Sequence, residues 1–291
     1  MLSLAETRPH HIENTRTMPM AGASGLRSAG VLRLQLKRRG DATVLGRLYQ
    51  SGCLKARLTK PEPHHCTEAV LLNTSGGIVG GDRLSLKIQW DAATQAAVTT
   101  QACEKLYRAG DCVATVRTEL DVEEGAKAEW LPQETIVFDR AMVERDLQVR
   151  LAIGATFTGL ESIILGRAEM GETVQQAYLR DGWRIWRSNR LIYADALNMR
   201  GDIGEMLARA STLQGQTAFA SLLHIGPRAE AELQNVRGTL SDAECVSGAS
   251  AWNGLLSVRL VARDSAALRR SLARVLRVVR GDLVLPRVWQ M

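Results

Sequence analysis

A long succession of short alternating segments, with almost no helical periodicity, most constrains what this chain can fold into. The alternation begins where Leu32, Leu34 and Leu36 are separated by Arg33 and Gln35. Further strands are predicted at 83–90, 96–101, 113–122, 126–131, 145–153, 156–165, 173–180, 184–187 and 191–196. About ten short strands without intervening helices argue against an α/β sheet. They favour a mainly β fold, namely a sandwich, a barrel or a β-helix-like stack.

Helical periodicity enters only after residue 200. Asp202, with Glu205 three residues later, has the pattern of a helix start. The clearest helix is predicted at 265–280, with Ser265 as its cap and Gly281 as its end. Two more strands are predicted at 218–224 and 255–261. We therefore expect a mobile leader over 1–28 and a single domain over 29–291. That domain comprises a β-rich body over 29–200 and an α+β part over 201–291.

The composition excludes several classes of protein. Of 291 residues 45% are hydrophobic and 23% charged, which is ordinary for a globular chain and unlike a disordered or collagenous one. The net charge of +6 permits an acidic partner, but only 4% of the residues are aromatic, which disfavours an RNA-stacking platform. The longest uncharged stretch, 210–227, contains polar residues unsuited to a membrane span. No signal peptide is evident, and the cysteines are odd in number, so we expect a cytoplasmic protein with reduced thiols.

The most distinctive segment is rich in glycine, with Gly76, Gly77, Gly80 and Gly81 followed by Asp82. Its spacing does not match the dinucleotide fingerprint, and a phosphate loop would carry lysine where this segment has a carboxylate. A carboxylate there would repel phosphate. We interpret the segment as a tight turn that presents Asp82 at a fixed place.

Other candidate residues have simpler interpretations. His64, His65 and Cys66 are potential nickel, copper or zinc ligands, but three adjacent residues cannot all face one ion on an extended strand, and their role stays open. His224 in an apolar run is best explained as a core histidine. No nucleophile elbow is present. The arginines between Arg269 and Arg280 could bind an acidic surface or nucleic acid, or could form the solvated face of a helix.

Five segments resemble those of one known family. They are Gly76–Asp82, Thr99–Lys105 with Tyr107 and Arg108, Glu129–Asp139, Leu165–Arg167 with Gly171 and Glu172, and Leu285–Trp289. In their order and spacing they resemble the UreD (or UreH) family of urease accessory proteins, over about residues 30 to 290. The resemblance implies an irregular β-helix-like stack with a few helices. It also implies a protein that is not an enzyme.

The resemblance further implies a scaffold or chaperone of urease maturation. Such a protein binds the urease apoprotein and UreF, and connects through UreF to the GTPase UreG. It would help deliver nickel to the urease active site through an internal tunnel. No tightly bound cofactor is expected, only Ni²⁺ in transit, and neither nucleic acid nor a membrane is an expected partner.

The resemblance places three carboxylates on the nickel route, namely Asp82, Glu161 and Asp195. Carboxylates hold nickel less firmly than thiolates or multiple histidines, which suits transient passage. Strand alternation puts Glu161 on the face of Ile163 and Leu165, where it needs water or a cation. A purely structural ion pair of Glu161, with Arg167 or Arg184, is the competing interpretation. Two other functions stay open from the residues alone: a hydrolase using carboxylates around Asp82 and Glu161, and an acidic-surface or nucleic-acid binding module using the C-terminal arginines.

Overall fold

Two β-sheets face each other across the main core. The computed structural model describes residues 27–59, 65–167, 170–209, 211–241 and 244–290. One sheet has seven strands, in the order β14 (Arg190–Asp202), β13 (Gln176–Arg187), β11 (Met142–Leu151), β8 (Ala114–Val122), β5 (Arg83–Trp90), β1 (Ala29–Arg39) and β2 (Ala42–Gly52). We call it the first sheet. Most of the predicted leader, residues 1–26, lies outside the described residues.

The second sheet has ten strands in the described chain. Its main path runs β16 (Cys245–Trp252), β17 (Leu255–Ala262), β15 (Ala218–Ile225), β12 (Thr156–Leu165), β9 (Lys127–Leu131), β6 (Gln95–Thr100), β4 (Thr67–Asn73) and β3 (Leu54–Leu58). The short strand β10 (Thr135–Val137) pairs with β12, and β7 (Glu104–Leu106) pairs with β10.

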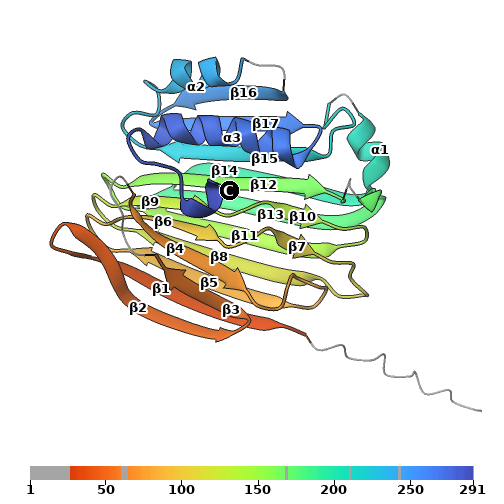
Figure 1. The fold of residues 1–291 in the computed structure, drawn as a ribbon, viewed down its shortest axis with the longest axis horizontal. Helices are drawn as coiled ribbons and strands as arrows, with labels where there is room; N and C mark the ends of the chain where they lie inside the picture. Colours follow the sequence, from red (N-terminus) through yellow and green to blue (C-terminus); the bar gives the residue numbers. More distant parts are fainter. Residues whose placement is uncertain (1–26, 60–64, 168–169, 210, 242–243, 291) are drawn as a thin grey trace, which may run out of the picture.

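The middle of the chain winds back and forth between the sheets. Successive strands β4, β5, β6, β8, β9, β11, β12 and β13 alternate between the second and the first sheet. Each pairs in parallel with the strand one winding away, as β5 does with β8 and β6 with β9. This winding is the predicted irregular β-helix-like stack, and the mainly β prediction is confirmed (Figure 1).

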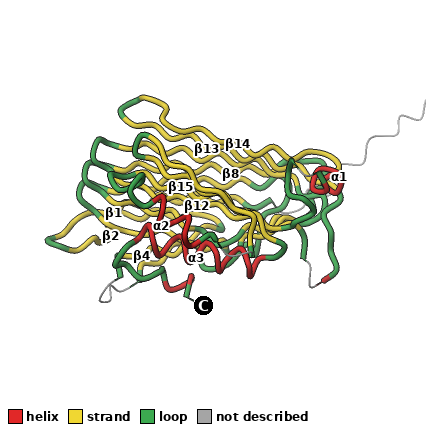
Figure 2. Tube along the Cα trace, turned by 90° about the horizontal axis from the view of Figure 1, so that it is seen from above, coloured by secondary structure: helices red, strands yellow, loops and turns green. Residues whose placement is uncertain are grey.

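The sheets differ in what covers their outer faces. Helix α3 (Ser265–Arg280) lies along the outside of the second sheet, with α2 (Leu233–Thr239) beside it (Figure 2). Fully buried Leu268, Leu272 and Leu276 of α3 form a second core with β15 and β17. The part of the second sheet that lies under α3 is therefore buried on both faces. The first sheet keeps a solvated outer face, which is why strands such as β5 alternate strictly between buried and exposed residues.

Several predicted elements are confirmed and some are corrected. Asp202 caps α1 (Ile203–Ala208) by accepting a hydrogen bond from the Glu205 backbone N–H. The cap of α3 is Asp264, one residue before the predicted Ser265. The predicted break between the strands at 173–180 and 184–187 is wrong, because the chain continues through it as one strand, β13. Strand β16 and helix α2 were not predicted. None of the helices in the described part of the chain is long and apolar enough to cross a membrane.

Candidate functional site

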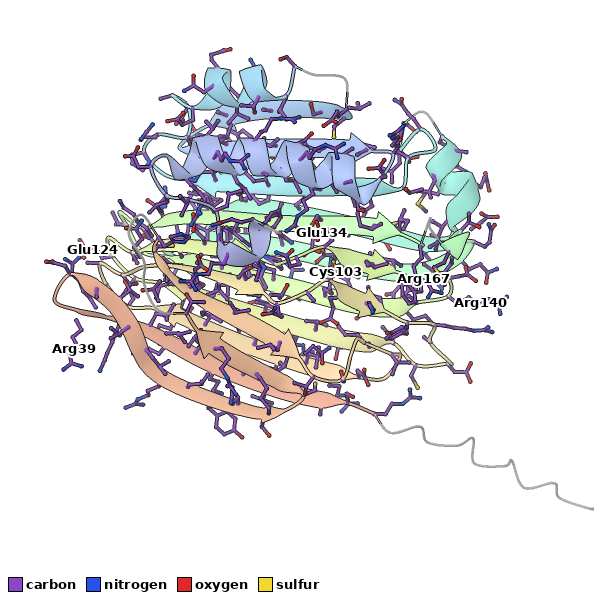
Figure 3. The ribbon with its side chains drawn as sticks, in the orientation of Figure 1. Arg39, Cys103, Glu124, Glu134, Arg140 and Arg167 are labelled. Atoms are coloured by element: carbon purple, nitrogen blue, oxygen red, sulfur yellow. The ribbon has the colours of Figure 1, made fainter. Side chains whose placement is uncertain are left out.

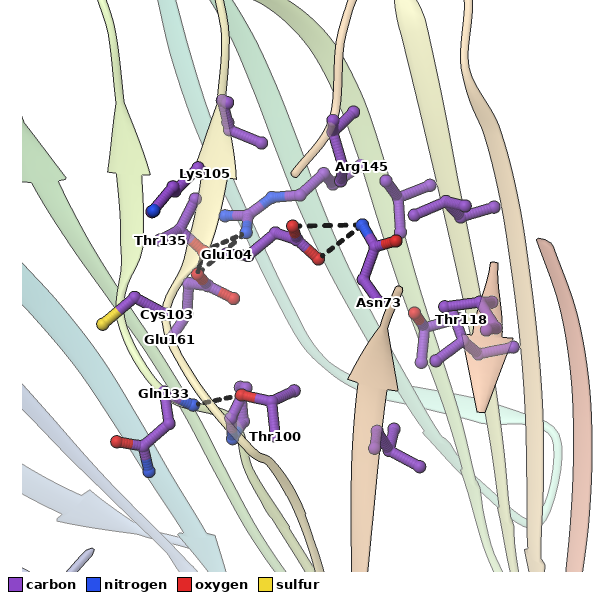
Figure 4. A pocket seen from close by; sticks show the side chains of 18 of the residues that line it. Asn73, Thr100, Cys103, Glu104, Lys105, Thr118, Gln133, Thr135, Arg145 and Glu161 are labelled. Carbon is purple, nitrogen blue, oxygen red and sulfur yellow. Dashed lines mark hydrogen bonds and ion pairs between the residues drawn. The ribbon is translucent and has the colours of Figure 1, made fainter. Parts of the chain in front are cut away.

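A cavity of about 380 Å³ lies between the two sheets. Apolar side chains such as Leu84, Leu86 and Trp130 form much of its wall. A polar group interrupts this wall; it includes Asp181 and, labelled in Figure 4, Asn73, Glu104, Thr118, Gln133, Thr135, Arg145 and Glu161. Buried carboxylates are costly unless they are paired or hydrated, so this group marks the cavity as a chemically specialised part of the core.

Arg145 lies at the centre of the polar group. It occupies an inward position of β11, where its neighbours on the same face, Val143 and Leu147, are buried apolar residues. Its Nη1 donates to Glu161 Oε1 at 2.9 Å, and its Nη2 donates to Asp181 Oδ2 at 2.6 Å. Asp181 is the register neighbour of Arg145 on β13, whereas Glu161 reaches across from the second sheet. The guanidinium therefore ties the two sheets together.

Burial changes the proton affinities of these groups. Desolvation raises the pKa of Glu161 to about 7, although the Arg145 guanidinium and the Thr135 hydroxyl oppose the rise. The two carboxylates raise the pKa of Arg145 against its own desolvation, so it stays charged. Desolvation also raises the pKa of Glu104 to about 6, because its hydrogen bonds from Asn73 compensate only in part. The cavity wall therefore contains the charged guanidinium of Arg145 beside two carboxyls, those of Glu104 and Glu161, whose pKa values are raised toward neutral pH.

A second, smaller cavity of about 40 Å³ adjoins the same carboxylates. Glu161 and Asp181 line both cavities, and Asp195 lines only the smaller one. Asp195 accepts a hydrogen bond from Arg259 at 2.7 Å and is about a quarter exposed. A volume of this size holds one or two waters. The structure thus brings Glu161 and Asp195 to one small cavity, as a shared role requires.

Asp82 has a different environment. Its Oδ1 accepts from the Ser28 backbone N–H at 2.7 Å and its Oδ2 from the Val79 backbone N–H at 2.9 Å. The side chain is 2% exposed and is not part of the wall of either cavity. These contacts pin the glycine turn to the start of β1. Asp82 and Glu161 therefore form no common site, and the arrangement needed for a carboxylate hydrolase is not found among the described residues.

The glycine turn itself has the predicted character. Gly77 has φ of 151°, and a Cβ there would lie 2.4 Å from the Tyr107 ring and 2.7 Å from the Lys105 carbonyl oxygen. Ile78 next to it bridges in parallel to Leu106. The close approach of these two segments is possible only without a side chain at residue 77.

The larger cavity extends to the loop after β6. Cys103 in this loop is exposed, lines the cavity, and contacts Glu134 Oε2 at 3.4 Å. Burial of the sulfur and the nearby carboxylate raise the pKa of Cys103 to about 11, so the thiol stays protonated. Figure 3 shows Cys103 and Glu134 next to each other close to the C-terminal turn of the chain.

The histidine–cysteine cluster is only partly described, because His64 lies outside the described residues. His65 Nδ1 contacts Glu68 at 3.2 Å, and the buried Cys66 lies 3.5 Å from Arg280. Desolvation raises the pKa of Cys66 to about 12. Within the described chain no three histidine, cysteine or acidic side chains are grouped as a metal site.

Two arginines of α3, Arg269 and Arg280, make their contacts inside the protein. Arg269 donates to Gln133, Glu134 and the Val288 carbonyl, and its guanidinium stacks over Trp289 at 4.7 Å. Arg280, with a side chain 1% exposed, forms two hydrogen bonds to Glu129. These contacts fix the C-terminal turn η2 (Arg287–Trp289) against the second sheet. They remove Arg269 and Arg280 from the basic surface on which a nucleic-acid interpretation depended, whereas Arg270 and Arg277 stay exposed.

Sequence reasoning missed Arg145 and Asp181. It expected Glu161 to pair with Arg167 or Arg184, and both of these partners are wrong. Arg167 pairs instead with Glu172, and Arg184 with Asp146. A signal for the missed pair was present. Arg145 and Asp181 each occupy an inward-facing position of a strand whose other inward-facing residues are apolar. A charged side chain is rarely buried at such a position unless it is paired.

The segments that suggested a family resemblance converge in space. The Tyr107 N–H donates to the Ile78 carbonyl, the Phe138 N–H to the Leu106 carbonyl, and the Gly166 N–H to the Val137 carbonyl. Arg167 then lies over the Phe138 ring at 4.4 Å. Four separate motifs thus build one end of the stack, beside the larger cavity.

Comparison with known proteins identifies the family. The model of the family described as UreD urease accessory protein matches residues 28–290. A protein of Rhizobium leguminosarum bv. trifolii named urease accessory protein UreD is 45% identical, covering 93% of this chain and 98% of the relative. Proteins of the same name from Xanthobacter autotrophicus and Agrobacterium fabrum are 42% and 39% identical, covering 90% and 93% of this chain and 90% and 97% of theirs.

The two-sheet stack with its polar cavity is therefore that of an accessory protein of urease rather than of an enzyme, as expected. The chain belongs to the UreD family of urease accessory proteins.

Proposed function

We propose that this protein is a cytoplasmic scaffold of urease maturation through which nickel passes on its way to the urease apoprotein. The observation that carries the proposal is the shared wall of the two cavities. Glu161 and Asp181 line both, so an ion in the larger cavity meets the same carboxylates as one in the smaller cavity beside Asp195. In this proposal the two cavities form one polar route between the sheets.

The ligand chemistry suits a cargo that must leave again. Oxygen ligands are harder than thiolates and bind Ni²⁺ less tightly, so an ion held by carboxylates and water is released readily. The raised pKa of Glu161, about 7, allows the carboxylate to exchange a proton for a metal ion near neutral pH. The raised pKa of the Cys103 thiol, at the loop end of the larger cavity, disfavours the thiolate form that would hold the ion more tightly.

The proposed partners are UreF, the GTPase UreG through UreF, and the urease apoprotein. In this proposal the protein is a nickel-handling chaperone that acts only within their complex. Belonging to the UreD family supports this assignment.

The test substitutes the two carboxylates whose roles the cavities predict. Glu161→Gln and Asp195→Asn keep the shape of each side chain and remove its charge. Both variants should assemble with UreF and the urease apoprotein as the parent does, while the rate of nickel-dependent urease activation falls. Because Arg145 keeps its ion pair to Asp181, Glu161→Gln leaves no unpaired buried cation.

Matched controls separate transport from stability. Glu129→Gln removes a carboxylate that is 12% exposed and paired with Arg280, closely matching Glu161 at 15% and paired with Arg145. Asp121→Asn matches Asp195, since both are 26% exposed and paired with arginine. Both controls should activate urease normally once folded. Normal activation by Glu161→Gln and Asp195→Asn together would contradict the nickel route.

A further inference from the structure

Arg145 occupies the place where the two cavities meet. Its Nη1 donates to Glu161 and to Thr135, both at 2.9 Å, and its Nη2 donates to Asp181. The three partners lie on different strands, so the guanidinium spans the gap between the sheets. Arg145 lines the larger cavity and is absent from the wall of the smaller one. It therefore covers the two carboxylates from the larger-cavity side.

Resting on the proposed nickel route, we infer that Arg145 is a cationic gate, which occupies the carboxylates until a divalent ion displaces it. A metal ion and a guanidinium cannot share Glu161 and Asp181, because like charges at such short distances in a low-dielectric interior repel strongly. Either Arg145 holds the two carboxylates or the ion does. The route is closed in the first state and open in the second.

The structure gives Arg145 somewhere to move. The larger cavity, about 380 Å³, lies directly on its side of the carboxylates. Glu104 is on the wall of this cavity and attracts Arg145 electrostatically, but its hydrogen bonds come from Asn73. Arg145 Nε is buried without a hydrogen-bond partner in the described chain, so the resting arrangement leaves one donor unsatisfied. A turn of the guanidinium toward Glu104 would free Glu161 and Asp181 while keeping the arginine paired.

The buried ion pair of Arg280 and Glu129 has a purely structural role and can be compared with that of Arg145. Arg280 donates to both carboxylate oxygens of Glu129, at 2.8 and 2.9 Å, and also to the Val284 carbonyl. It does not belong to the wall of either cavity. Neither cavity therefore offers Arg280 space into which to withdraw, and Arg280 provides the control for Arg145.

The experiment measures Ni²⁺ binding to the full chain by equilibrium dialysis. Arg145→Met removes the resident cation and leaves Glu161 and Asp181 free. It should bind one Ni²⁺ at least about 10-fold more tightly than the parent. Adding Glu161→Gln to this variant should abolish the gain. Arg280→Met should lose stability but keep the parental affinity for nickel.

A second variant covers the case in which Arg145→Met does not fold. Arg145→Lys keeps the charge but cannot bridge two carboxylates with a planar fork, so it should show a smaller gain in nickel affinity. A folded Arg145→Met with parental affinity would overturn the gate. A gain in nickel affinity that persists in the double variant with Glu161→Gln would also overturn it. If Arg145→Met fails to fold, parental nickel affinity in Arg145→Lys would overturn the gate.

The outcomes for the gate and for the route are separable. If Glu161→Gln and Asp195→Asn impair urease activation but Arg145→Met binds nickel as the parent does, the route stands and the gate is wrong. If Arg145→Met gains affinity while the two carboxylate variants activate urease normally, the proposed route is wrong. Arg145 then does not gate nickel transfer either, and Glu161 and Asp181 are only a pair of carboxylates that can bind a cation.

Discussion

At the scale of single residues, the interior of this protein depends on whether each buried charge has a partner. Asp82 is satisfied by two backbone N–H groups, and Glu161 by Arg145 and Thr135. The side-chain donor to Glu104 is the neutral Asn73 amide rather than a guanidinium. Desolvation therefore dominates at Glu104 and raises its pKa to about 6 from an ordinary 4.5.

This raised pKa predicts a pH-dependent stability difference between the parent and Glu104→Gln. Between pH 4.5 and 6 the folded parent binds more protons than the unfolded chain, so stability is lost as pH rises through this window. Glu104→Gln, which has no charge at this position, does not lose this stability as the pH rises. Urea denaturation should show Glu104→Gln gaining up to about 2 kcal/mol over the parent at pH 7.5, and no such gain at pH 4.

A variant without a titrating group provides the comparison. Leu272→Ala should reduce the free energy of unfolding by similar amounts at both pH values. Equal differences between Glu104→Gln and the parent at pH 4 and pH 7.5 would show that Glu104 ionises as easily in the folded protein as in the unfolded chain.

At the scale of elements, helix α3 joins the C-terminal turn to the second sheet. Its apolar stripe packs on β15 and β17, as the periodicity predicted. Its arginines serve two distinct purposes. Arg269 donates to Glu134, which directly precedes β10, and to the carbonyl of Val288 near the end of the chain. Arg277 is exposed. Arginine therefore fixes α3 to neighbouring segments at residue 269 and faces solvent at residue 277.

Arg269→Gln should release the C-terminal turn. The substitution leaves Glu134, with a side chain only 7% exposed, without its ion-pair partner and removes the stacking on Trp289. Urea denaturation should show a loss of about 3 kcal/mol. Arg277→Gln, on the exposed side of the same helix, should change stability by less than about 0.5 kcal/mol. Equal effects of the two substitutions would mean that the Arg269 contacts do not hold the chain end.

At the scale of the whole molecule, one sheet serves two cores. Leu160 of β12 packs into the core beneath the helices, and Ile163 of the same strand packs into the core between the sheets. Any loss of packing under α3 is therefore felt by strands that also close the cavity. This sharing supports the expectation that residues 29–291 form one domain.

Cooperative unfolding is the expected consequence. Leu272→Ala, at a fully buried position of α3, should cost about 2–5 kcal/mol. Amide hydrogen exchange at low urea concentration should show the same reduction in protection for α3 and for β8, which lies in the opposite sheet. Loss of protection confined to α3 and α2 would show instead that the helical layer unfolds by itself and that the chain has two units.

The local pattern of the sequence was enough to predict much of the fold. Period-two alternation predicted β5 and β12 with their observed bounds, and the stripe in 265–280 predicted α3. It also placed Glu161 on the inward face, since alternation is a property of neighbouring residues. Strands β2, β3 and β4 were not predicted, because burial on both faces or at an edge weakens alternation.

Only the tertiary structure decided which charges meet. Arg145 is 16 residues from Glu161 and 36 from Asp181, and the three lie on strands of two different sheets. Their meeting depends on how far the chain advances with each winding, which no local pattern records. The family resemblance predicted Glu161 and Asp195 as carboxylates of one nickel route without placing them in space. The winding of the chain places both beside one cavity, and it brings Arg145 to Glu161 and Asp181, which line both cavities.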